Sequence, residues 1–420
     1  MKITALLMVS IAIALMGCST QGDSAANAAS PKKVFDDGLM GWATQHANGA
    51  PTGGAGADAL SCTVANLQEF KQCLKLMHKK SLLDKPFVMY IKGVIDGSTE
   101  ADGWGYQKAE IKRSNLSLVG LVDNNKMPTL RAIWVYTSGG SNLIIRNLRF
   151  ITGRDHELKE VEEGCHITDT DYCDWNAEPD ALTVQETQRV WIDHCEFTDG
   201  PDYNGVNPHT DHYKSYDGLL DIKRGANYVT VSYSKFSNHD KSILIGHSDS
   251  HSTDDFHVTF YRNYFNHLGQ RSPRVRYGKV HLLNNLYENT KKKSHEQKYY
   301  LAYAIGPAYQ ADIYSEKNVF DVKGAAPADL IGVAEFSKWA QRFTDKGSWL
   351  NGAAVDLTTV AKQAITAQET EKKAGLPYIG GASWTPTEAY PYTTLNDPKA
   401  IRAVVKANAG VGVVAPVINF

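Results

Sequence analysis

Six segments of the chain share one eight-residue pattern of apolar and polar positions. Each segment begins with an aliphatic residue and ends with an aromatic one, and its third position is apolar in all but the last segment. We call these segments the octets; they span residues 143–150, 190–197, 229–236, 258–265, 280–287 and 313–320. Because apolar and polar positions alternate and β-branched residues are frequent, the octets are strand-like rather than helical.

The octets recur at start-to-start spacings between 22 and 47 residues. A fixed unit separated by inserts of variable length is typical of a solenoid, in which each coil stacks on its neighbours. We therefore predict an all-β fold, a parallel β-helix with one octet in each coil. In that fold the aromatic residues at position eight would stack into one column. At position six, Asn263, Asn285 and Asn318 would form a ladder of side-chain amides.

A second set of short apolar runs lies between the octets, at residues 180–184, 218–222, 242–246, 273–276 and 302–306. These runs predict another sheet with one strand in each coil. Charged residues stand at their edges in the order Asp180, Asp217, Asp221, Lys241, Arg271, Arg274 and Arg276. Since strands of adjacent coils lie about 4.8 Å apart, we expect these side chains to form one patch, with carboxylates at one end and cations at the other.

The residue types in this patch indicate its chemistry. Converging carboxylates without Cys or closely spaced His favour Ca²⁺ before Mg²⁺, so Asp180, Asp217 and Asp221 are candidate metal ligands. For each Asp taken singly, the alternative is an ordinary turn residue at the start of a strand. Arginine side chains bind carboxylates through two parallel hydrogen bonds, which favours an acidic polysaccharide as the ligand of Arg274 and Arg276.

Other classes of site fit the sequence less well. Histidines are frequent between residues 209 and 257, but no HExxH or paired-Cys spacing indicates zinc, and no GxSxG motif indicates a serine nucleophile. A formal net charge of −2 over 420 residues argues against a general nucleic-acid or membrane-surface binder.

The N-terminal segment has the pattern of an export signal. Lys2 precedes an apolar run that ends at Met16, and residues 15–18 (LMGC) resemble a bacterial lipobox. We therefore expect residues 1–18 to be a signal peptide with lipidation at Cys18, 19–33 to be a flexible tether, and 34–420 to be a single catalytic domain. An ordinary cleaved signal is the alternative. Either way the protein would be exported from a bacterium, as an outer-membrane lipoprotein or in secreted form, with no membrane attachment other than that lipid.

The remaining cysteines fall into two close pairs and one single residue. Cys62 lies near Cys73, and Cys165 lies near Cys173, so both pairs are disulfide candidates in an exported protein. Cys195 occupies position six of an octet, where a buried free thiol would fit.

At these residues the chain resembles the pectate lyases of polysaccharide lyase family 1. The specific matches are VWIDHCEF at 190–197, HDKSILIGHSDS at 239–250 and RSPRVRYGKVHLLNN at 271–285. The resemblance extends from about residue 35 to the end of the chain. It implies a right-handed parallel β-helix with long loops on one side, acting as a monomer. It also implies Ca²⁺-dependent β-elimination of (1→4)-α-D-galacturonan (polygalacturonate) to 4,5-unsaturated oligogalacturonates.

The resemblance also assigns roles to individual residues. Asp180, Asp217 and Asp221 would bind Ca²⁺, with Glu178 as an additional candidate. Lys241 and Arg276 would bind the substrate, and Arg271 would be the catalytic base. Departures from the family pattern are His247, where a small residue is usual, and the inserts at 154–179 and 200–216.

Two other functions remain open at this point. A pectin lyase, which acts on methyl-esterified chains, needs no Ca²⁺ and lacks the acidic site, so the three Asp residues argue against it. A non-catalytic glycan-binding β-helix would have no need of Lys241 and Arg271, and both are present.

Overall fold

The computed structural model describes residues 38–100, 104–155, 177–200, 216–250, 255–292, 299–332, 341–372 and 380–414. All of them belong to one compact unit, Phe35–Phe420. The expected signal peptide, the tether, Cys18, Cys165 and Cys173 lie outside the described residues. Among the described residues, no helix is both long and apolar enough to cross a membrane.

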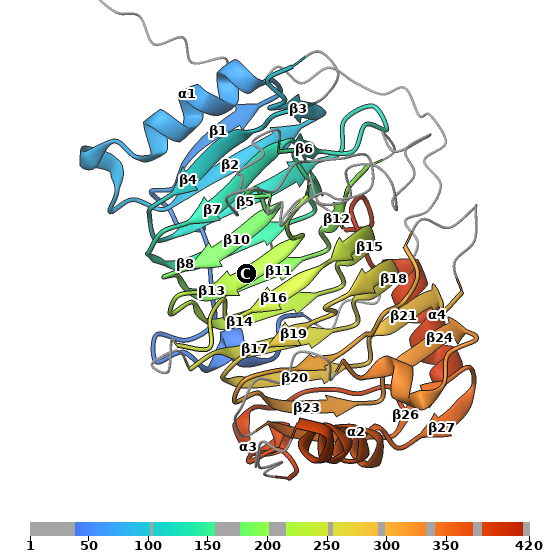
Figure 1. Cartoon of the computed structure of the whole chain (residues 1–420). Coiled ribbons are helices and arrows are strands. Elements are labelled where there is room, and N and C mark those ends of the chain that lie inside the picture. Colours follow the sequence, from blue (N-terminus) through green and yellow to red (C-terminus); the bar gives the residue numbers. More distant parts are fainter. Residues whose placement is uncertain are drawn as a thin grey trace, which may run out of the picture. The chain divides into compact units, whose positions relative to one another are not determined.

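Three sheets run side by side along the unit (Figure 1). Sheet 1 contains β1 (Leu60–Val64), β2 (Phe87–Lys92), β5 (Leu116–Leu121), β8 (Ser141–Arg146), β11 (Gln188–Asp193), β14 (Asn227–Ser232), β17 (His257–Tyr261), β20 (Lys279–Leu283), β23 (Asp312–Glu316) and β25 (Arg342–Lys346). Sheet 2 contains β4 (Gln107–Ile111), β7 (Ile133–Thr137), β10 (Leu182–Gln185), β13 (Leu220–Lys223), β16 (Ile243–Ile245), β19 (Arg274–Val275) and β22 (Gly306–Pro307). Sheet 3 contains β3 (Val94–Asp96), β6 (Thr129–Arg131), β9 (Arg149–Ile151), β12 (Glu196–Thr198), β15 (Lys235–Lys241), β18 (Tyr264–Gln270), β21 (Leu286–Thr290), β24 (Val319–Lys323), β26 (Ser348–Leu350) and β27 (Ala353–Val355).

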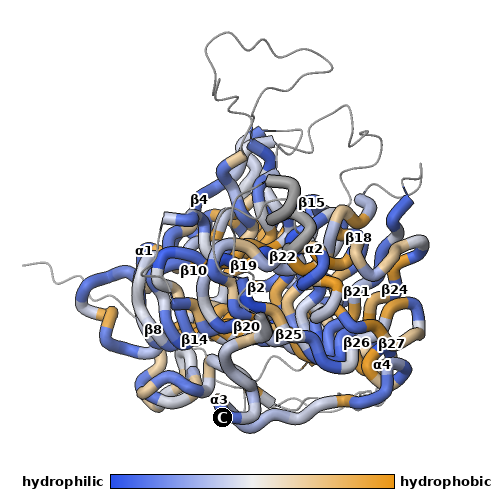
Figure 2. The backbone as a smooth tube through the Cα atoms, turned by 60° about the horizontal axis from the view of Figure 1, so that its bottom comes forward, coloured by the Kyte–Doolittle hydropathy of each residue, from blue (hydrophilic) through white to orange (hydrophobic). Residues whose placement is uncertain are grey.

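Strands of successive coils pair in parallel, as β11 does with both β8 and β14. The pairing of β26 with β27 is antiparallel and lies at the end of sheet 3. This arrangement is a parallel β-helix, so the predicted fold class is confirmed. In Figure 2, hydrophobic stretches recur along the strands of successive coils, whereas the peripheral turns are mostly hydrophilic.

Each octet is divided between two strands, which the alternation alone did not indicate. In the octet 190–197, β11 ends at Asp193 and β12 begins at Glu196. The fifth position of every octet adopts a positive φ: Asn147 56°, His194 49°, Tyr233 43°, Arg262 55°, Asn284 50° and Lys317 50°. That left-handed residue turns the chain from sheet 1 to sheet 3 while apolar side chains on both sides of the corner stay inside the coil.

The aromatic column and the amide ladder are both present. Ring centroids of consecutive members lie 4.9, 4.8, 5.4, 4.6 and 4.5 Å apart from Phe150 to Phe320. The side-chain amide of Asn263 donates to Asn285 Oδ1 at 3.1 Å, and that of Asn285 donates to Asn318 Oδ1 at 3.0 Å. The coils are therefore held in register from inside as well as by backbone hydrogen bonds.

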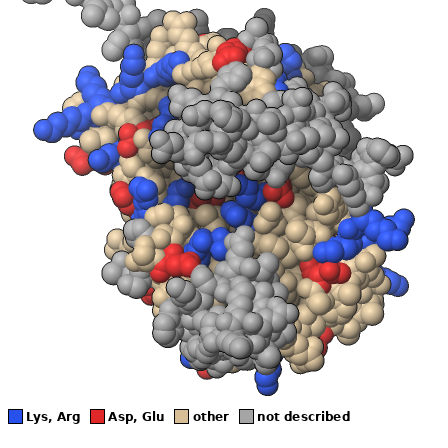
Figure 3. Space-filling view, viewed as in Figure 1, with Lys and Arg blue, Asp and Glu red and all other residues tan. Residues whose placement is uncertain are grey.

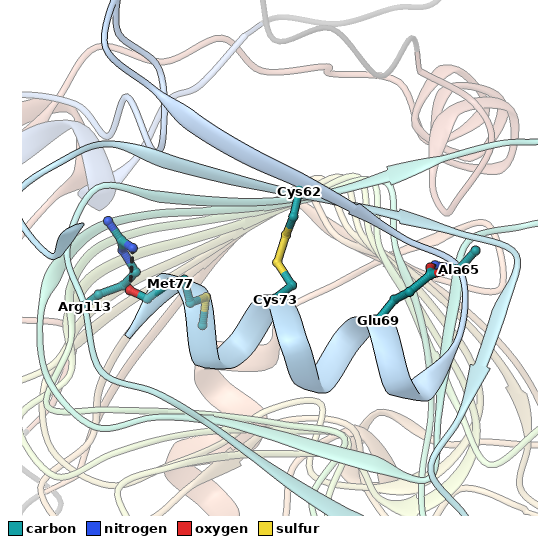
Figure 4. Close-up of a disulfide and its surroundings, with 6 residues drawn as sticks. All are labelled: Cys62, Ala65, Glu69, Cys73, Met77 and Arg113. Carbon is teal, nitrogen blue, oxygen red and sulfur yellow. Dashed lines mark hydrogen bonds between the residues drawn. A yellow bond between two sulfur atoms is a disulfide. The ribbon is translucent and has the colours of Figure 1, made fainter. Parts of the chain in front are cut away.

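Helix α1 (Leu67–Met77) packs at the N-terminal end of the β-helix (Figure 4). Phe70, Cys73 and Met77 are its buried residues, and the predicted Cys62–Cys73 disulfide joins the helix to β1. A solenoid needs such a cap because its last coil has no neighbour to cover it. Cys195 is the buried free thiol that the sequence predicted, and burial raises its pKa to about 12.

Terminal segments cover the outer faces of two sheets. Thr259 of sheet 1 accepts a hydrogen bond from the Trp42 backbone N–H at 3.0 Å and bonds the Tyr390 hydroxyl at 2.9 Å. Helix α4 (Pro398–Asn408) places Ile401 and Val405 in a buried cluster with residues of sheet 3. The charged residues predicted to form the functional patch lie on or beside the remaining sheet, sheet 2.

Candidate active site

One row of outward-facing positions crosses sheet 2. Asp221 pairs in register with Thr183 on one side and Leu244 on the other, and Leu244 pairs with Arg274. Leu220 and Ile222, which flank Asp221, are both fully buried, so strand alternation turns Asp221 outward. Figure 3 shows basic and acidic side chains meeting in a recess over the middle of this face.

Two carboxylates share one lysine beside this row. The Lys223 ammonium lies 3.3 Å from Asp180 Oδ2 and 3.0 Å from Asp221 Oδ2. Asp180 Oδ2 also accepts a hydrogen bond from the Thr183 hydroxyl. The other oxygen of Asp180, Oδ1, is buried and has no hydrogen-bond partner. A buried acceptor without a donor is costly, so this oxygen is suited to a cation.

Asp180 Oδ1 and Asp221 Oδ1 both face the backbone of Gly218, which carries no side chain. A Cβ atom on Gly218 would lie 2.7 Å from Asp180 Oδ1 and 3.0 Å from Asp221 Oδ1. Glycine thus leaves open the space onto which both carboxylates converge. This space and the carboxylate donors fit a hard, oxygen-seeking ion such as Ca²⁺.

Asp217 lies within electrostatic range of this pair. Burial, and then the charge of Asp221, raise its pKa to about 6, while Lys241, Lys223 and Arg271 act in the opposite direction. Burial and the Asp221 charge also raise the pKa of Asp180 well above its ordinary value. These carboxyl groups therefore depend on nearby cations to remain ionised.

The carboxylates do not form a closed cluster of three. Within the described ranges, no group of three or more His, Cys, Asp or Glu side chains is arranged to hold a metal. Asp180 and Asp221 meet around Lys223, and Asp217 stands beside them. Glu178 is exposed, and its backbone N–H donates to Asp155 Oδ2 at 3.0 Å.

The predicted cationic residues lie at the neighbouring corner. Lys241 ends β15 and pairs in register with Gln270, so it lies beside Arg271. The Arg271 backbone has a φ of 61°, and its carbonyl accepts from Ile243 N and from Ser242 Oγ, both at 2.7 Å. The Nε atom of Arg271 is buried without a hydrogen-bond partner. The backbone of Arg271 is thus anchored while that side-chain donor is unused.

Arg276 is held by groups of its own chain. Its Nε lies 2.7 Å from Asp249 Oδ1, and its Nη1 donates to the Gly246 carbonyl at 3.0 Å. Arg274, which the sequence placed in the same charged patch, is buried in β19.

Sequence reasoning missed three groups that support the carboxylates. Lys223 follows Asp221 by two positions and so shares its strand face, a signal that was available. Thr183 lies in register with Asp221. His239, which is buried, contacts Asp199 Oδ1 at 2.6 Å and the Asp217 carbonyl oxygen at 3.0 Å. His239 begins the HDKSILIGHSDS motif, but its contact with the Asp217 backbone depends on the fold.

Acidic and basic residues that meet on one sheet of a parallel β-helix are suited to a cation and an acidic polysaccharide, which points to the class of proteins that act on such chains. Comparison with known proteins identifies the family. The family model described as "Pectate lyase" matches residues 4–414. The chain therefore belongs to the pectate lyase family, and it is a polysaccharide lyase.

Individual relatives agree with this assignment. Pectate lyase A of Dickeya chrysanthemi is 34% identical over 381 residues, which cover 88% of this chain and 90% of that protein. A pectate trisaccharide-lyase of Bacillus licheniformis is 25% identical over 402 residues, covering 95% and 93% of the two chains. A solved pectate lyase bound to hexasaccharide matches with a TM-score of 0.70 and 25% identity, covering 89% of this chain and 97% of that one.

Proposed function

We propose that this pectate lyase cleaves polygalacturonate by a Ca²⁺-dependent β-elimination in which Asp180, Asp217 and Asp221 hold the ion. The observation that supports the ion site best is the buried, unpartnered Asp180 Oδ1, which faces the same Gly218 backbone as Asp221 Oδ1. When bound, Ca²⁺ supplies positive charge that neutralises the carboxylate next to the reacting C5 atom. Lys223 contacts the same two carboxylates, so it competes with a cation for them.

The proposed base is Arg271. In the reaction the C5 proton passes to its guanidine nitrogen, the C5–H electron pair forms the C4=C5 double bond, and the C4–O bond to the leaving sugar breaks. Water supplies the proton for the leaving oxygen. A guanidinium can accept a proton only after it has lost one, so alkaline solution should favour turnover.

The neighbours of Arg271 suit this role. Lys241 lies beside it through the Lys241–Gln270 register pair and is proposed to bind a substrate carboxylate. Arg276 is proposed as a second carboxylate ligand. Its contact with Asp249 shows that the guanidinium is already oriented toward an acidic partner.

The remaining features are proposals from the sequence. We infer export, lipidation at Cys18 and a Cys165–Cys173 disulfide in a protein that acts as a monomer. Its relatives are bacterial pectate lyases, which supports a bacterial origin.

The decisive experiment measures release of unsaturated product, by its ultraviolet absorbance, from polygalacturonate and from highly methyl-esterified pectin. Activity on polygalacturonate should disappear in excess EDTA and return with Ca²⁺ but poorly with Mg²⁺. Full activity in EDTA, or a preference for esterified pectin, would instead assign a pectin lyase.

A charge-neutral variant tests the site itself. Gly218→Ala should abolish high-affinity Ca²⁺ binding, because its methyl group would occupy the space in front of Asp180 Oδ1 and Asp221 Oδ1. Gly225→Ala, on the same stretch of chain, controls for general destabilisation: its φ of 72° strains an alanine there, but a Cβ meets nothing within 4 Å, so calcium affinity should be kept. Normal calcium affinity in Gly218→Ala would place the ion elsewhere.

A further inference from the structure

An aromatic surface with a lysine above it lies on the same face of sheet 2, toward the N-terminal end. Trp134 and Tyr136, both on β7, are partly exposed, and their ring centroids lie 5.6 Å apart. The ring of Tyr106 lies 6.2 Å from that of Trp134.

Lys108 of β4 completes this surface. It is exposed and pairs in register with Trp134. Its ammonium lies 4.2 Å from the centre of the Trp134 ring and 4.9 Å from that of Tyr136. It forms no ion pair or hydrogen bond with any residue in the described part of the chain. Two cation–π contacts thus hold an ammonium group whose hydrogen-bond donors face solvent.

This surface is continuous with the carboxylates of the active site. Tyr136 pairs in register with Thr183, and Thr183 pairs with Asp221. Trp134 Nε1 donates to the Thr183 hydroxyl at 2.8 Å, and that hydroxyl donates to Asp180. Strands β7 and β4 are two and three steps from β13 along sheet 2, which corresponds to roughly 10 to 14 Å, the length of a few sugar units.

We propose that Lys108, Trp134 and Tyr136 form a distal subsite for a galacturonate unit of the same substrate chain. This inference rests on polygalacturonate as the substrate. A uronate offers a carboxylate, which the Lys108 ammonium binds, and a pyranose face of C–H groups, which packs on an aromatic ring. Sites for extended ligands combine apolar surface with a few placed polar groups in this way.

The neighbouring Glu110 carboxylate opposes binding of a uronate and limits where on this surface the sugar can lie. Glu110 accepts a hydrogen bond from Ser138, and that contact is the largest cause of its lowered pKa, so it stays ionised at the edge of Tyr136. Its charge repels a carboxylate on that side. The bound uronate is therefore expected to lie over Trp134 and Lys108, away from Glu110.

The test compares substrates of different length in the full protein. Lys108→Met keeps the aliphatic reach of the side chain and removes its charge. Its KM should rise about fivefold on hexagalacturonate and polygalacturonate, the effect expected for loss of one exposed ion pair, with kcat and the KM for trigalacturonate unchanged. Lys71→Met, at an exposed lysine of α1, is the matched control. A change that is equal on all lengths, or no change on the long substrates, would overturn the subsite.

Two tryptophan variants separate substrate binding from support of Asp180. Trp134→Ala should reproduce the length-dependent rise in KM. Trp134→Phe keeps an aromatic ring and loses the hydrogen bond to Thr183, so it should retain most affinity for hexagalacturonate. If Trp134→Phe instead weakened calcium affinity and turnover on every substrate, Trp134 would act only through Thr183 and the subsite would be wrong.

Calorimetric binding of hexagalacturonate to wild type and to Lys108→Met, measured in excess EDTA so that the chain is not cleaved, checks the subsite independently of turnover. Weaker binding in the variant supports the subsite even if the wild-type protein failed to cleave the chain, a result that would contradict the proposed reaction instead.

Discussion

The buried His239 imidazole bonds the backbone carbonyl of Asp217 at 3.0 Å. Its other ring nitrogen lies 2.6 Å from Asp199 Oδ1, and Asp199 accepts a further hydrogen bond from the Tyr299 hydroxyl at 3.0 Å. Burial alone would lower the pKa of His239, but the Asp199 carboxylate raises it above its ordinary value. Both ring nitrogens therefore face hydrogen-bond acceptors, and these contacts fix the backbone that carries Asp217.

From this contact we predict that His239→Ala weakens calcium affinity about tenfold, the usual effect of losing a group that orients a metal ligand. Turnover at saturating Ca²⁺ should change little. His239→Gln retains one donor and should recover part of the affinity. His267→Ala, in the neighbouring strand β18, is the control. Calcium titrations of activity measure all three variants, and an unchanged midpoint in His239→Ala would contradict the prediction.

We expect Arg271→Lys to lose turnover by about 10²-fold or more, the contribution of a positioned base, while oligogalacturonate binding is kept. A lysine is shorter and lacks the planar fork of arginine, so it cannot replace the base. Steady-state kinetics and calorimetry separate turnover from binding. Near-normal turnover of Arg271→Lys at alkaline pH would require another base, such as Lys241 or hydroxide.

Arg276→Ala should raise KM as well as lower kcat/KM, because a carboxylate ligand contributes to ground-state binding. Asp249→Asn is the informative companion, since it removes the charge that now pairs with Arg276. Its KM should stay the same or fall. A rise in KM for Asp249→Asn equal to that of Arg276→Ala would show that the pair acts as one structural unit.

Replacing Lys223, whose ammonium competes with a cation for Asp180 and Asp221, should strengthen calcium binding in the absence of substrate. Lys223→Met leaves Asp180 and Asp221 without their shared partner, so the carboxylates gain more from a bound ion. We expect the dissociation constant of Ca²⁺, measured by calorimetry, to fall at least several-fold. A weaker affinity would indicate that Lys223 positions the carboxylates rather than competing for them.

A buried carboxyl far along the β-helix predicts a pH dependence of stability. Burial raises the pKa of Asp345 to about 6 although Ser315 and Ser348 donate to its Oδ1. The folded state therefore binds its proton more tightly than the unfolded state. Below about pH 4, the pKa of this carboxyl in the unfolded chain, Asp345 contributes its full stabilisation of the folded state. That stabilisation is lost as the pH rises through about 6, its pKa in the folded state.

Asp345→Asn should abolish that loss, because the amide oxygen can accept both serine hydrogen bonds without a buried charge. At pH 8 the variant should be more stable than wild type by roughly 2–3 kcal/mol, the equivalent of a shift of about two pKa units. Near pH 4 the two should be equal. Thermal unfolding in the two buffers measures this difference, and equal stabilities at pH 8 would show that the charge is accommodated.

The sequence alone determined that the chain forms stacked coils and which charged residues lie near one another on one sheet. Aliphatic and aromatic residues at fixed octet positions can all be buried only by stacking, which is why Phe150 to Phe320 form a column. Stacking also converts long sequence separations into steps of about 4.8 Å, so the order of Asp180, Asp221 and Arg274 along the chain predicted their order on the sheet.

The tertiary structure decided how those neighbours pair. The corner residues with positive φ, such as His194, are invisible to an alternation pattern because apolar side chains continue inward on both sides of the turn. Whether Asp180 meets a lysine, a serine or a third carboxylate depends on strand register and side-chain rotamers across coils separated by long inserts. For that reason the contacts of Lys223 with both carboxylates, of His239 with the Asp217 carbonyl and of Asp249 with Arg276 emerged only from the folded chain.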